Sequence, residues 1–202
     1  MKTPAALPSQ MRRGFTLVEL LVVIGIMAVV ATVIGVGLSR GGEGASLTAA
    51  QNMMMSQLAA TRAQAALRGE NAALVVVVDA GDLPRSRRVV GVAVNDAGLW
   101  RLISDPVQLP GQVGVIDAAA EQSLWAGDLA VAVAPGDTTV NCRAVEIAPS
   151  GSLVNAGGGV IWLSIGQLGA NGWQPREGSS RTGLRVSRYG ALQLINQPLG
   201  AE

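Results

Sequence analysis

The sequence predicts an α+β protein in which a long N-terminal hydrophobic helix and an amphipathic helix precede an antiparallel β-sheet. Residues 15–38 are almost continuously apolar, and residues 46–68 place apolar side chains at spacings of three and four, which is the helical period. From residue 72 onward the spacing changes to two, which is typical of strands. Because strands follow the helix in series, we expect the amphipathic helix to pack across the sheet rather than against a partner's helix.

The composition lacks the common ingredients of an active site. The 202-residue chain has a formal net charge of +1, no histidine and one cysteine, Cys142. Histidine is the commonest general base and transition-metal ligand, and a single cysteine can form neither an intrachain disulfide nor a thiolate cluster. Asp79 and Asp82 are too few for a calcium loop. We therefore expect no enzyme, no cofactor and no metal, with Cys142 as a buried structural thiol; the alternatives are a membrane-tethered enzyme and a reactive or intermolecular thiol.

The apolar N-terminal run is long enough to cross a membrane. From Phe15 to Leu38 the only ionisable side chain is Glu19, and residues rising ~1.5 Å each would span ~36 Å, against ~30 Å for a bilayer core. Basic residues and no acid precede the run, which by the positive-inside rule places residues 1–14 in the cytoplasm. We predict a single-pass protein of the bacterial inner membrane with a periplasmic C-terminal domain. A cleaved secretory signal would be shorter and would carry its small-residue site after the run, whereas Gly14 precedes it.

Glu19 is the unusual residue of this run. A carboxylate costs ~2.5–3.5 kcal/mol at the centre of a membrane helix and less towards the interface. One interpretation is that Glu19 reaches the headgroups at the cytoplasmic end of the helix. The other is that a positive charge in an oligomer pairs with it.

The stretch Arg13–Val23, RGFTLVELLVV, resembles the prepilin cleavage and methylation motif of type IV pilins and type II secretion pseudopilins. The resemblance implies that prepilin peptidase cuts after Gly14 and that Phe15 becomes the N-methylated new N-terminus. It implies that Glu19 then neutralises the terminal amine of a neighbouring subunit during assembly. The implied partners are other pilin or pseudopilin subunits in a filament, an inner-membrane assembly platform and the lipid bilayer.

The spacing of Phe15 and Glu19 leaves two pairings open. The two residues lie four positions apart, so a new amine at Phe15 could pair with Glu19 within one subunit. Pairing between staggered subunits would instead neutralise two charges in a filament interior and fix the register, because an unpaired buried charge is heavily penalised.

Glycines divide the chain after the apolar run. Residues 40–45 contain Gly41, Gly42 and Gly44 and are expected to break the helix or form a hinge, because glycine is entropically costly in helices. The predicted parts are a cleaved leader, a transmembrane and assembly helix, a Gly-rich hinge and a periplasmic pilin-like domain, at residues 1–14, 15–39, 40–45 and 46–202. The amphipathic helix of the last part, ending near Gly69, carries an apolar stripe of Leu47, Ala50, Met54, Leu58, Thr61 and Ala65.

Eight segments with period-two patterning predict strands. Two of the loops between them, Asn95–Gly98 and Arg188–Gly190, contain turn-forming residues and predict hairpins. The segments are Ala72–Val78, Arg88–Val94, Leu99–Ile103, Leu129–Ala134, Ala144–Ala148, Val160–Ile165, Leu184–Arg188 and Ala191–Ile195.

Three stretches of this domain, Ala65–Val76, Val145–Gly151 and Leu184–Leu192, resemble the GspH/FimT branch of minor pseudopilins and minor pilins. The resemblance implies a minor subunit of a type II secretion pseudopilus, with a role in protein secretion, or of a type IV pilus. It also implies a structural, interaction-driven protein rather than an enzyme.

Arginines near the C-terminus suggest an alternative function. Arg176, Arg181, Arg185 and Arg188 fall close together in the sequence, and some FimT-type minor pilins bind DNA through basic C-terminal residues. The alternative is therefore a DNA-binding minor pilin for natural transformation, whose phosphate contacts would make binding strongly salt-dependent. The competing interpretation is a solvated face balanced by acids such as Glu177.

Overall fold

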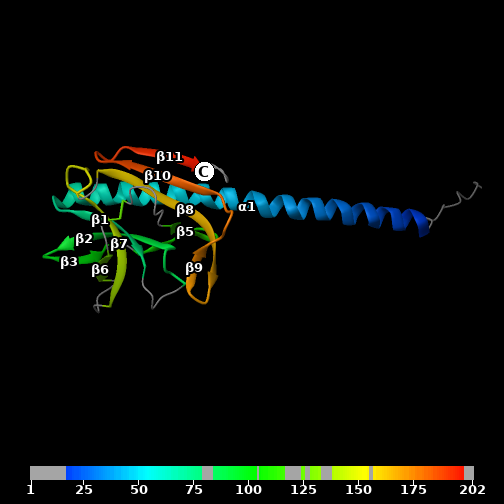
Figure 1. Ribbon diagram of the computed structural model, residues 1–202, viewed down its shortest axis with the longest axis horizontal. Coiled ribbons are helices and arrows are strands. Elements are labelled where there is room, and N and C mark those ends of the chain that lie inside the picture. The colour runs from blue at the N-terminus through cyan, green and yellow to red at the C-terminus, as the bar shows by residue number, and fades with distance from the viewer. Residues whose placement is uncertain are drawn as a thin grey trace, which may run out of the picture. The chain divides into compact units, whose positions relative to one another are not determined.

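A computed structural model describes residues 17–78, 84–103, 105–116, 124–125, 128–132, 138–154 and 157–197. The chain divides into two compact units, Met1–Gly41 and Gly42–Glu202. Helix α1, Leu17–Arg68, begins in the first unit and continues into the second (Figure 1). Each unit is described separately below.

Within the second unit, α1 buries one face. The predicted apolar stripe is confirmed, because all six of its residues, from Leu47 to Ala65, are almost completely buried. The helix ends as predicted at Gly69, which adopts a left-handed φ of 68° and donates its N–H to the Ala65 carbonyl at 3.0 Å. Glycine is the residue that closes a helix in this conformation most readily.

The predicted helix break at residues 40–45 is wrong, whereas the alternative of a hinge in this segment, where the two units meet, stays a prediction. The backbone stays helical through Gly42, Glu43 and Gly44. Glycine costs only about 1 kcal/mol per residue in a helix, and most helical stability comes from packing of an apolar face, here the buried stripe from Leu47 to Ala65. The Glu43 carboxylate also lies 2.6 Å from Nη2 of Arg176.

The described residues form eleven strands, which include all eight predicted segments with shifted ends. The largest shift is at the predicted strand Ala144–Ala148, which begins at Thr139. Strands β4, β5 and β9 were not predicted. The strands are β1 Ala72–Val77, β2 Val89–Asp96, β3 Leu99–Leu102, β4 Val107–Gln108, β5 Val113–Ile116, β6 Asp128–Ala132, β7 Thr139–Ile147, β8 Gly158–Gly169, β9 Gly172–Pro175, β10 Arg181–Ser187 and β11 Leu192–Gln197.

Five strands close into a small barrel rather than an open antiparallel sheet. The order is β1-β7-β6-β3-β2, with β1 also paired to β2, and β4 extends from β2. Strands β3 and β6 pair in parallel while the other pairs are antiparallel, so the predicted sheet is corrected to a mixed one. A five-stranded barrel has room only for small interior side chains. Its interior is Ala73, Val75, Val77, Val89, Ala93, Val131, Cys142 and Ala144.

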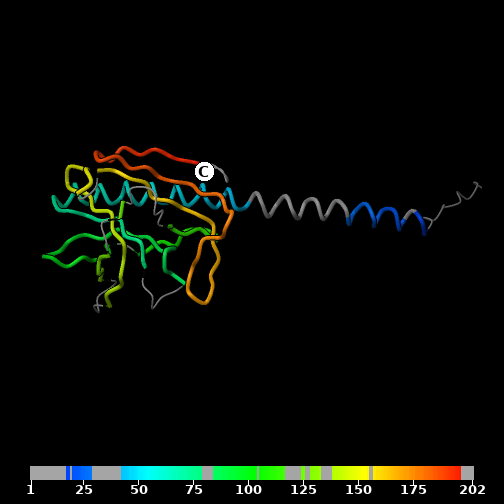
Figure 2. The backbone as a smooth tube through the Cα atoms, in the orientation of Figure 1, coloured from blue at the N-terminus to red at the C-terminus, as the bar shows by residue number. Residues whose placement is uncertain are grey.

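The second sheet has the order β11-β10-β8-β5, with β9 paired to β8. Figure 2 shows its strands β10 and β11, in orange and red, on one side of the cyan helix and the green strands of the barrel on the other. Helix residues such as Met54 and Leu58 join side chains of both sheets, such as Leu74 and Leu184, in one large core. The predicted α+β class, with a helix packed on strands, is confirmed.

Strand β1 belongs to both cores, which explains why every one of its residues is buried. Side chains alternate along a strand. Leu74 and Val76 face the large core under the helix, whereas Ala73, Val75 and Val77 face the barrel interior.

The other face of the second sheet is covered by tryptophans that lie over glycines. Trp162 and Trp173 pack with Ile116 and Val160. A Cβ atom on Gly114 would lie 2.6 Å from Cε2 of Trp173. The indole N–H of Trp173 donates to the Gln112 carbonyl at 2.9 Å, so the tip of β8 and β9 is held against β5.

Candidate assembly site

The predicted processing site lies outside the described residues. This applies to Gly14, Phe15 and the side chain of Glu19, whose backbone belongs to the first turn of α1. Among the side chains that the structure does describe, no helical stretch is both long and apolar enough to cross a membrane. The predicted span at residues 15–39 extends beyond these side chains and stays a prediction.

The described start of α1 is an apolar surface. Its described side chains are exposed, from 48% at Val23 to 79% at Leu17. Because a helix turns once every 3.6 residues, consecutive apolar residues here cover every side of it. A helix that is apolar all round is stable only when lipid or other protein surrounds it. The exposed residues are Leu17, Val18, Leu20, Leu21, Val22, Val23, Ile24, Ile26 and Met27.

One of the four predicted basic residues, Arg176, ties the helix to the sheet domain. It follows β9, where its N–H donates to the Ile165 carbonyl at 3.0 Å and its carbonyl accepts from Ser179. Its guanidinium donates to the Glu43 carboxylate at 2.6 Å, with both side chains about half exposed. Arg176 therefore acts as a partner of the helix, a role that the sequence did not predict.

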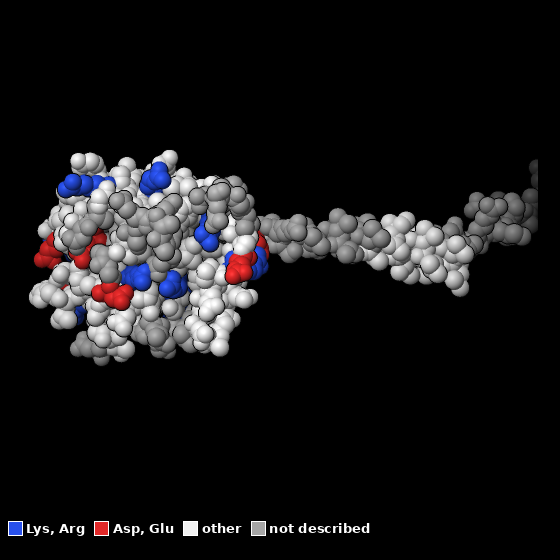
Figure 3. Space-filling view, in the orientation of Figure 1, with Lys and Arg blue, Asp and Glu red and all other residues white. Residues whose placement is uncertain are grey.

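The other three predicted arginines do not form one cluster. Arg181 and Arg185 are exposed on the same side of β10, because they are four residues apart in a strand. Arg188 lies in the loop after β10 and its carbonyl accepts from Leu153. At ~3.3 Å per residue, Arg188 is ~23 Å along the strand from Arg181. On the face shown in Figure 3, basic and acidic side chains are interspersed rather than separated.

Arg62 is a second helix-to-sheet contact that the sequence analysis missed. Its Nη2 donates to the carbonyl of Gly190 in the loop between β10 and β11, and burial lowers the pKa of Arg62 from its usual value. A Cβ atom on Gly190 would lie 2.6 Å from this nitrogen and 2.8 Å from the Gly151 carbonyl. The sequence signal that could have indicated this contact is the position of Arg62 directly after Thr61, a member of the apolar stripe.

The described residues contain no metal-ligand cluster, and their one cysteine is buried. No group of three or more His, Cys, Asp or Glu side chains in this part of the chain could hold a metal ion. Cys142 is fully buried in the barrel, as predicted for a structural thiol.

Comparison with known proteins supports the N-terminal prediction. A family described as "Prokaryotic N-terminal methylation motif" matches residues 9–35, a range that contains Gly14, Phe15 and Glu19. This confirms the resemblance of the N-terminus to that of type IV pilin-like proteins.

The other two comparisons do not identify a family for the rest of the chain. No curated protein matches the chain in sequence. Among solved structures, the minor pseudopilin EpsH from the type 2 secretion system of Vibrio cholerae resembles it, with 12% identity, a TM-score of 0.41, and coverage of 73% of this chain and 93% of that one. A likeness at this level carries no argument about the domain or its function.

Proposed function

We propose that this chain, whose N-terminus carries the prokaryotic methylation motif, is a minor subunit of a type II secretion pseudopilus or a type IV pilus. Prepilin peptidase cuts after Gly14, and Phe15 is then N-methylated. Residues 15–39 anchor the chain in the inner membrane, and the α+β domain lies in the periplasm. The subunit serves protein secretion or pilus assembly through contacts with other subunits and the assembly platform, as in the GspH/FimT branch, and catalyses no reaction.

The observation that carries this proposal is an apolar helix that directly follows the cleavage motif and contains one acid, Glu19. The helix start is apolar on all sides and exposed, so it requires lipid in the membrane and neighbouring helices in a filament. Cleavage creates an amine at the same end of the helix as Glu19. A neighbouring subunit's amine and Glu19 then neutralise each other, which removes the penalty for a buried charge.

Intact-mass measurement of the protein from cells that express prepilin peptidase tests the proposal. We expect the mature chain to lack residues 1–14 and to carry one additional methyl group. Gly14→Glu should accumulate as the longer precursor in the membrane. Gly25→Ala is the matched control, because Gly25 has open space around its Cα and lies outside the cleavage site, so it should be processed normally. Recovery of Met1 in assembled, functional protein would overturn the proposal.

A DNA-binding minor pilin for natural transformation is the second candidate. The observation in its favour is the pair Arg181 and Arg185, both exposed on one side of β10, where both can contact the phosphate backbone of one duplex. The full-length protein in neutral detergent should then retard duplex DNA at low salt, with binding that falls steeply as salt rises. Replacing both arginines with glutamine should abolish the shift, whereas Arg101→Gln should not. Absence of a shift at low salt excludes this candidate.

A further inference from the structure

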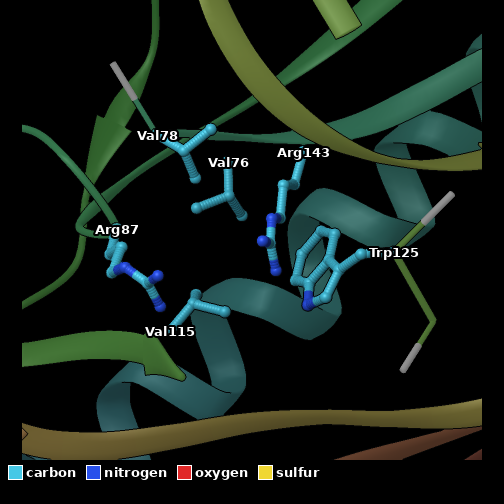
Figure 4. Close-up of a pocket in the computed structure, with 6 residues that line it drawn as sticks. All are labelled: Val76, Val78, Arg87, Val115, Trp125 and Arg143. Atoms are coloured by element: carbon cyan, nitrogen blue, oxygen red, sulfur yellow. The ribbon is translucent and has the colours of Figure 1, made fainter. Parts of the chain in front are cut away.

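The pocket among strands β1, β5 and β7 is too small for a ligand (Figure 4). Its volume is about 10 Å³, which is room for about one water molecule, whereas small-molecule sites measure ~300–1,000 Å³. This pocket therefore belongs to the packing of the second unit. Its lining residues are Val76, Val78, Arg87, Val115, Trp125 and Arg143.

Strand β11 forms an edge of the second sheet and pairs with β10 alone among the described strands. Hydrogen-bonded pairs alternate with non-bonded pairs along an antiparallel ladder. The pair of Ser187 and Ala191 is a bonded one, since the Ser187 N–H donates to the Ala191 carbonyl at 2.9 Å. Counted from this pair, every second residue of β11 directs its N–H and carbonyl groups away from β10. These outward residues are Leu192, Leu194 and Asn196.

The other edge strands of the described residues are protected in ways that β11 is not. Proteins protect a sheet edge by keeping it short, by placing charged residues or proline on it, or by covering it. Strand β4 has two residues, and β9 has four and ends in Pro175. The open side of β5 is occupied at Val115, whose N–H donates to the Arg87 carbonyl. Strand β11 has six residues without charge, proline or glycine, and its register with β10 is regular throughout. Such an edge is a template for a further strand.

The side chains of β11 favour an uncharged strand with an apolar residue at its centre. Asn196 and Leu192 lie on the side of the helix, because Oδ1 of Asn196 is 3.5 Å from Nε2 of Gln51 and Leu192 packs against the large core. Side chains of alternate residues share a face, so Leu194 lies on this side too, yet it is 49% exposed. An apolar side chain directly opposite Leu194 on an added strand would cover it.

The outward residues are also symmetric around Leu194, so β11 of a second copy could pair with them antiparallel. The two copies would then run in opposite directions, because antiparallel partners of this kind are related by a two-fold axis. Under the proposed function all copies are anchored in one membrane by the same end and run in the same direction. The choice of a different protein as the partner rests on this part of the proposed function.

We propose that the open edge of β11 binds an extended, uncharged segment of a different protein as an added strand. The contacts are the outward N–H and carbonyl groups of Leu192, Leu194 and Asn196, with an apolar side chain of the partner opposite Leu194. In this mode of recognition the main-chain hydrogen bonds supply affinity and the alternate side chains supply specificity.

A peptide with the sequence of β11, acetyl-LQLINQ-amide, is the probe for this edge, because its symmetry lets it pair antiparallel in the same register. It is titrated into the full-length protein in neutral detergent, and amide hydrogen exchange is followed by NMR. We expect the peptide to slow exchange at the outward amides of Leu192, Leu194 and Asn196. The same peptide N-methylated at its second leucine cannot donate to the Leu194 carbonyl and should bind at least about tenfold more weakly. Absence of slowed exchange, or equal binding of the methylated peptide, would overturn the proposal.

Leu194→Pro separates edge pairing from folding. Proline is tolerated on an edge strand where the N–H faces outward, and β10 does not use this N–H. We expect a melting temperature close to that of the wild type and at least about tenfold weaker peptide binding. Leu194→Ala is the matched control, since it shortens the same side chain but keeps the N–H, and it should bind more tightly than Leu194→Pro. Asn196→Pro removes a second outward N–H and gives an independent test; wild-type affinity in both proline variants would contradict the assignment.

Cross-linking distinguishes a different protein from a second copy. In the antiparallel pairing of two copies, the Leu194→Cys variant would bring its new thiols together at the axis, whereas the buried Cys142 would not react. Rapid formation of a disulfide-linked dimer by Leu194→Cys, but not by Leu99→Cys on the other sheet, would overturn the choice of a different protein. We expect neither variant to form such a dimer rapidly. The proposed function fails separately, through the mass of the N-terminus, and that failure would leave peptide binding to the edge unchanged.

Discussion

Two stretches of the same helix are rich in apolar residues, but they distribute them differently. The start of α1, from Leu17 to Met27, has apolar side chains on every side, and they are exposed. Between Leu47 and Ala65 the apolar residues form one stripe, and the domain's own sheets bury it. The comparison teaches that the distribution of apolar residues around a helix, more than their number, indicates whether the chain itself or its surroundings must cover them.

The largest expected effect is that of Glu19→Val on assembly, because this substitution removes the one ionisable side chain of the first stretch, Leu17 to Met27. Under the proposed function, the neighbouring subunit's amine would lose its partner at a penalty of ~3–5 kcal/mol. We expect normal membrane insertion and processing but at least roughly a hundredfold less incorporation into filaments in competition with wild type. Co-expression of differently tagged chains and quantification of each tag in sheared filaments measures this ratio.

Val22→Leu is the control for that experiment, since it changes an exposed apolar residue of the same stretch without altering charge. It should incorporate as the wild type does. Equal incorporation of Glu19→Val would contradict a charge-pairing role.

Leu58→Ala and Leu21→Ala apply the same substitution to the two stretches. Leu58 is fully buried in the large core, whereas Leu21 is exposed. We expect Leu58→Ala to lower the free energy of unfolding by ~2–5 kcal/mol and Leu21→Ala to leave it unchanged. Chemical denaturation followed by tryptophan fluorescence measures both free energies of unfolding. Equal losses in the two variants would contradict the conclusion that the domain's own sheets cover only the second stretch.

Gly190→Ala tests how the buried stretch of the helix is held to the second sheet. Gly190 has a φ of 82°, and an added Cβ would displace Arg62 and meet the Gly151 carbonyl. We expect a loss of ~1–3 kcal/mol from the strained backbone and the disturbed contact. Gly98→Ala is the matched control, because Gly98 has a φ of 91° but open space around it; a loss as large as that of Gly190→Ala would show that conformation alone is responsible.

Glu43→Gln has the smallest expected effect and concerns the beginning of the buried stretch. The Glu43–Arg176 pair is about half exposed, and such pairs contribute ~0.2–1 kcal/mol. We expect thermal unfolding at low salt to reveal this small loss and 1 M salt to remove the difference from wild type. Asp96→Asn, in the longer and more exposed pair with Arg101, should show less.

The sequence was sufficient for those parts of the fold that have a local signal. The stripe from Leu47 to Ala65 and the turn Asn95–Gly98 were predictable because periodicity and turn residues depend only on neighbours in the chain. At this turn, Ala97 and Gly98 both have positive φ values, and the Asn95 side chain accepts from the Gly98 N–H at 2.8 Å.

The missed elements depend on contacts that are distant in the sequence. Barrel closure needs β1 to pair with both β2 and β7, and no local pattern specifies a partner or register. Strand β5 was missed because Gly114 resembles a turn residue, yet it is there to admit Trp173. The helix was predicted to break or to form a hinge at residues 40–45 from the local cost of glycine, whereas its continuity depends on packing and on Arg176, which lies much later in the chain.

The functional residues also differ in whether the sequence alone could predict them. The cleavage and assembly residues Gly14, Phe15 and Glu19 were predicted from contiguous residues, and the matched motif at 9–35 contains them. The contacts of Arg62 and Arg176 were not predicted, because their partners Gly190 and Glu43 lie far away in the sequence.

The position of Cys142 gives the protein a natural reporter of its own unfolding. Its thiol is the only one in the chain and is fully enclosed by the barrel, whose strand β1 also forms part of the core beneath the helix. Because loosening β1 disturbs both interiors, a thiol reagent should gain access only when the whole domain opens. The rate of modification by a dilute reagent then measures global opening without any introduced label.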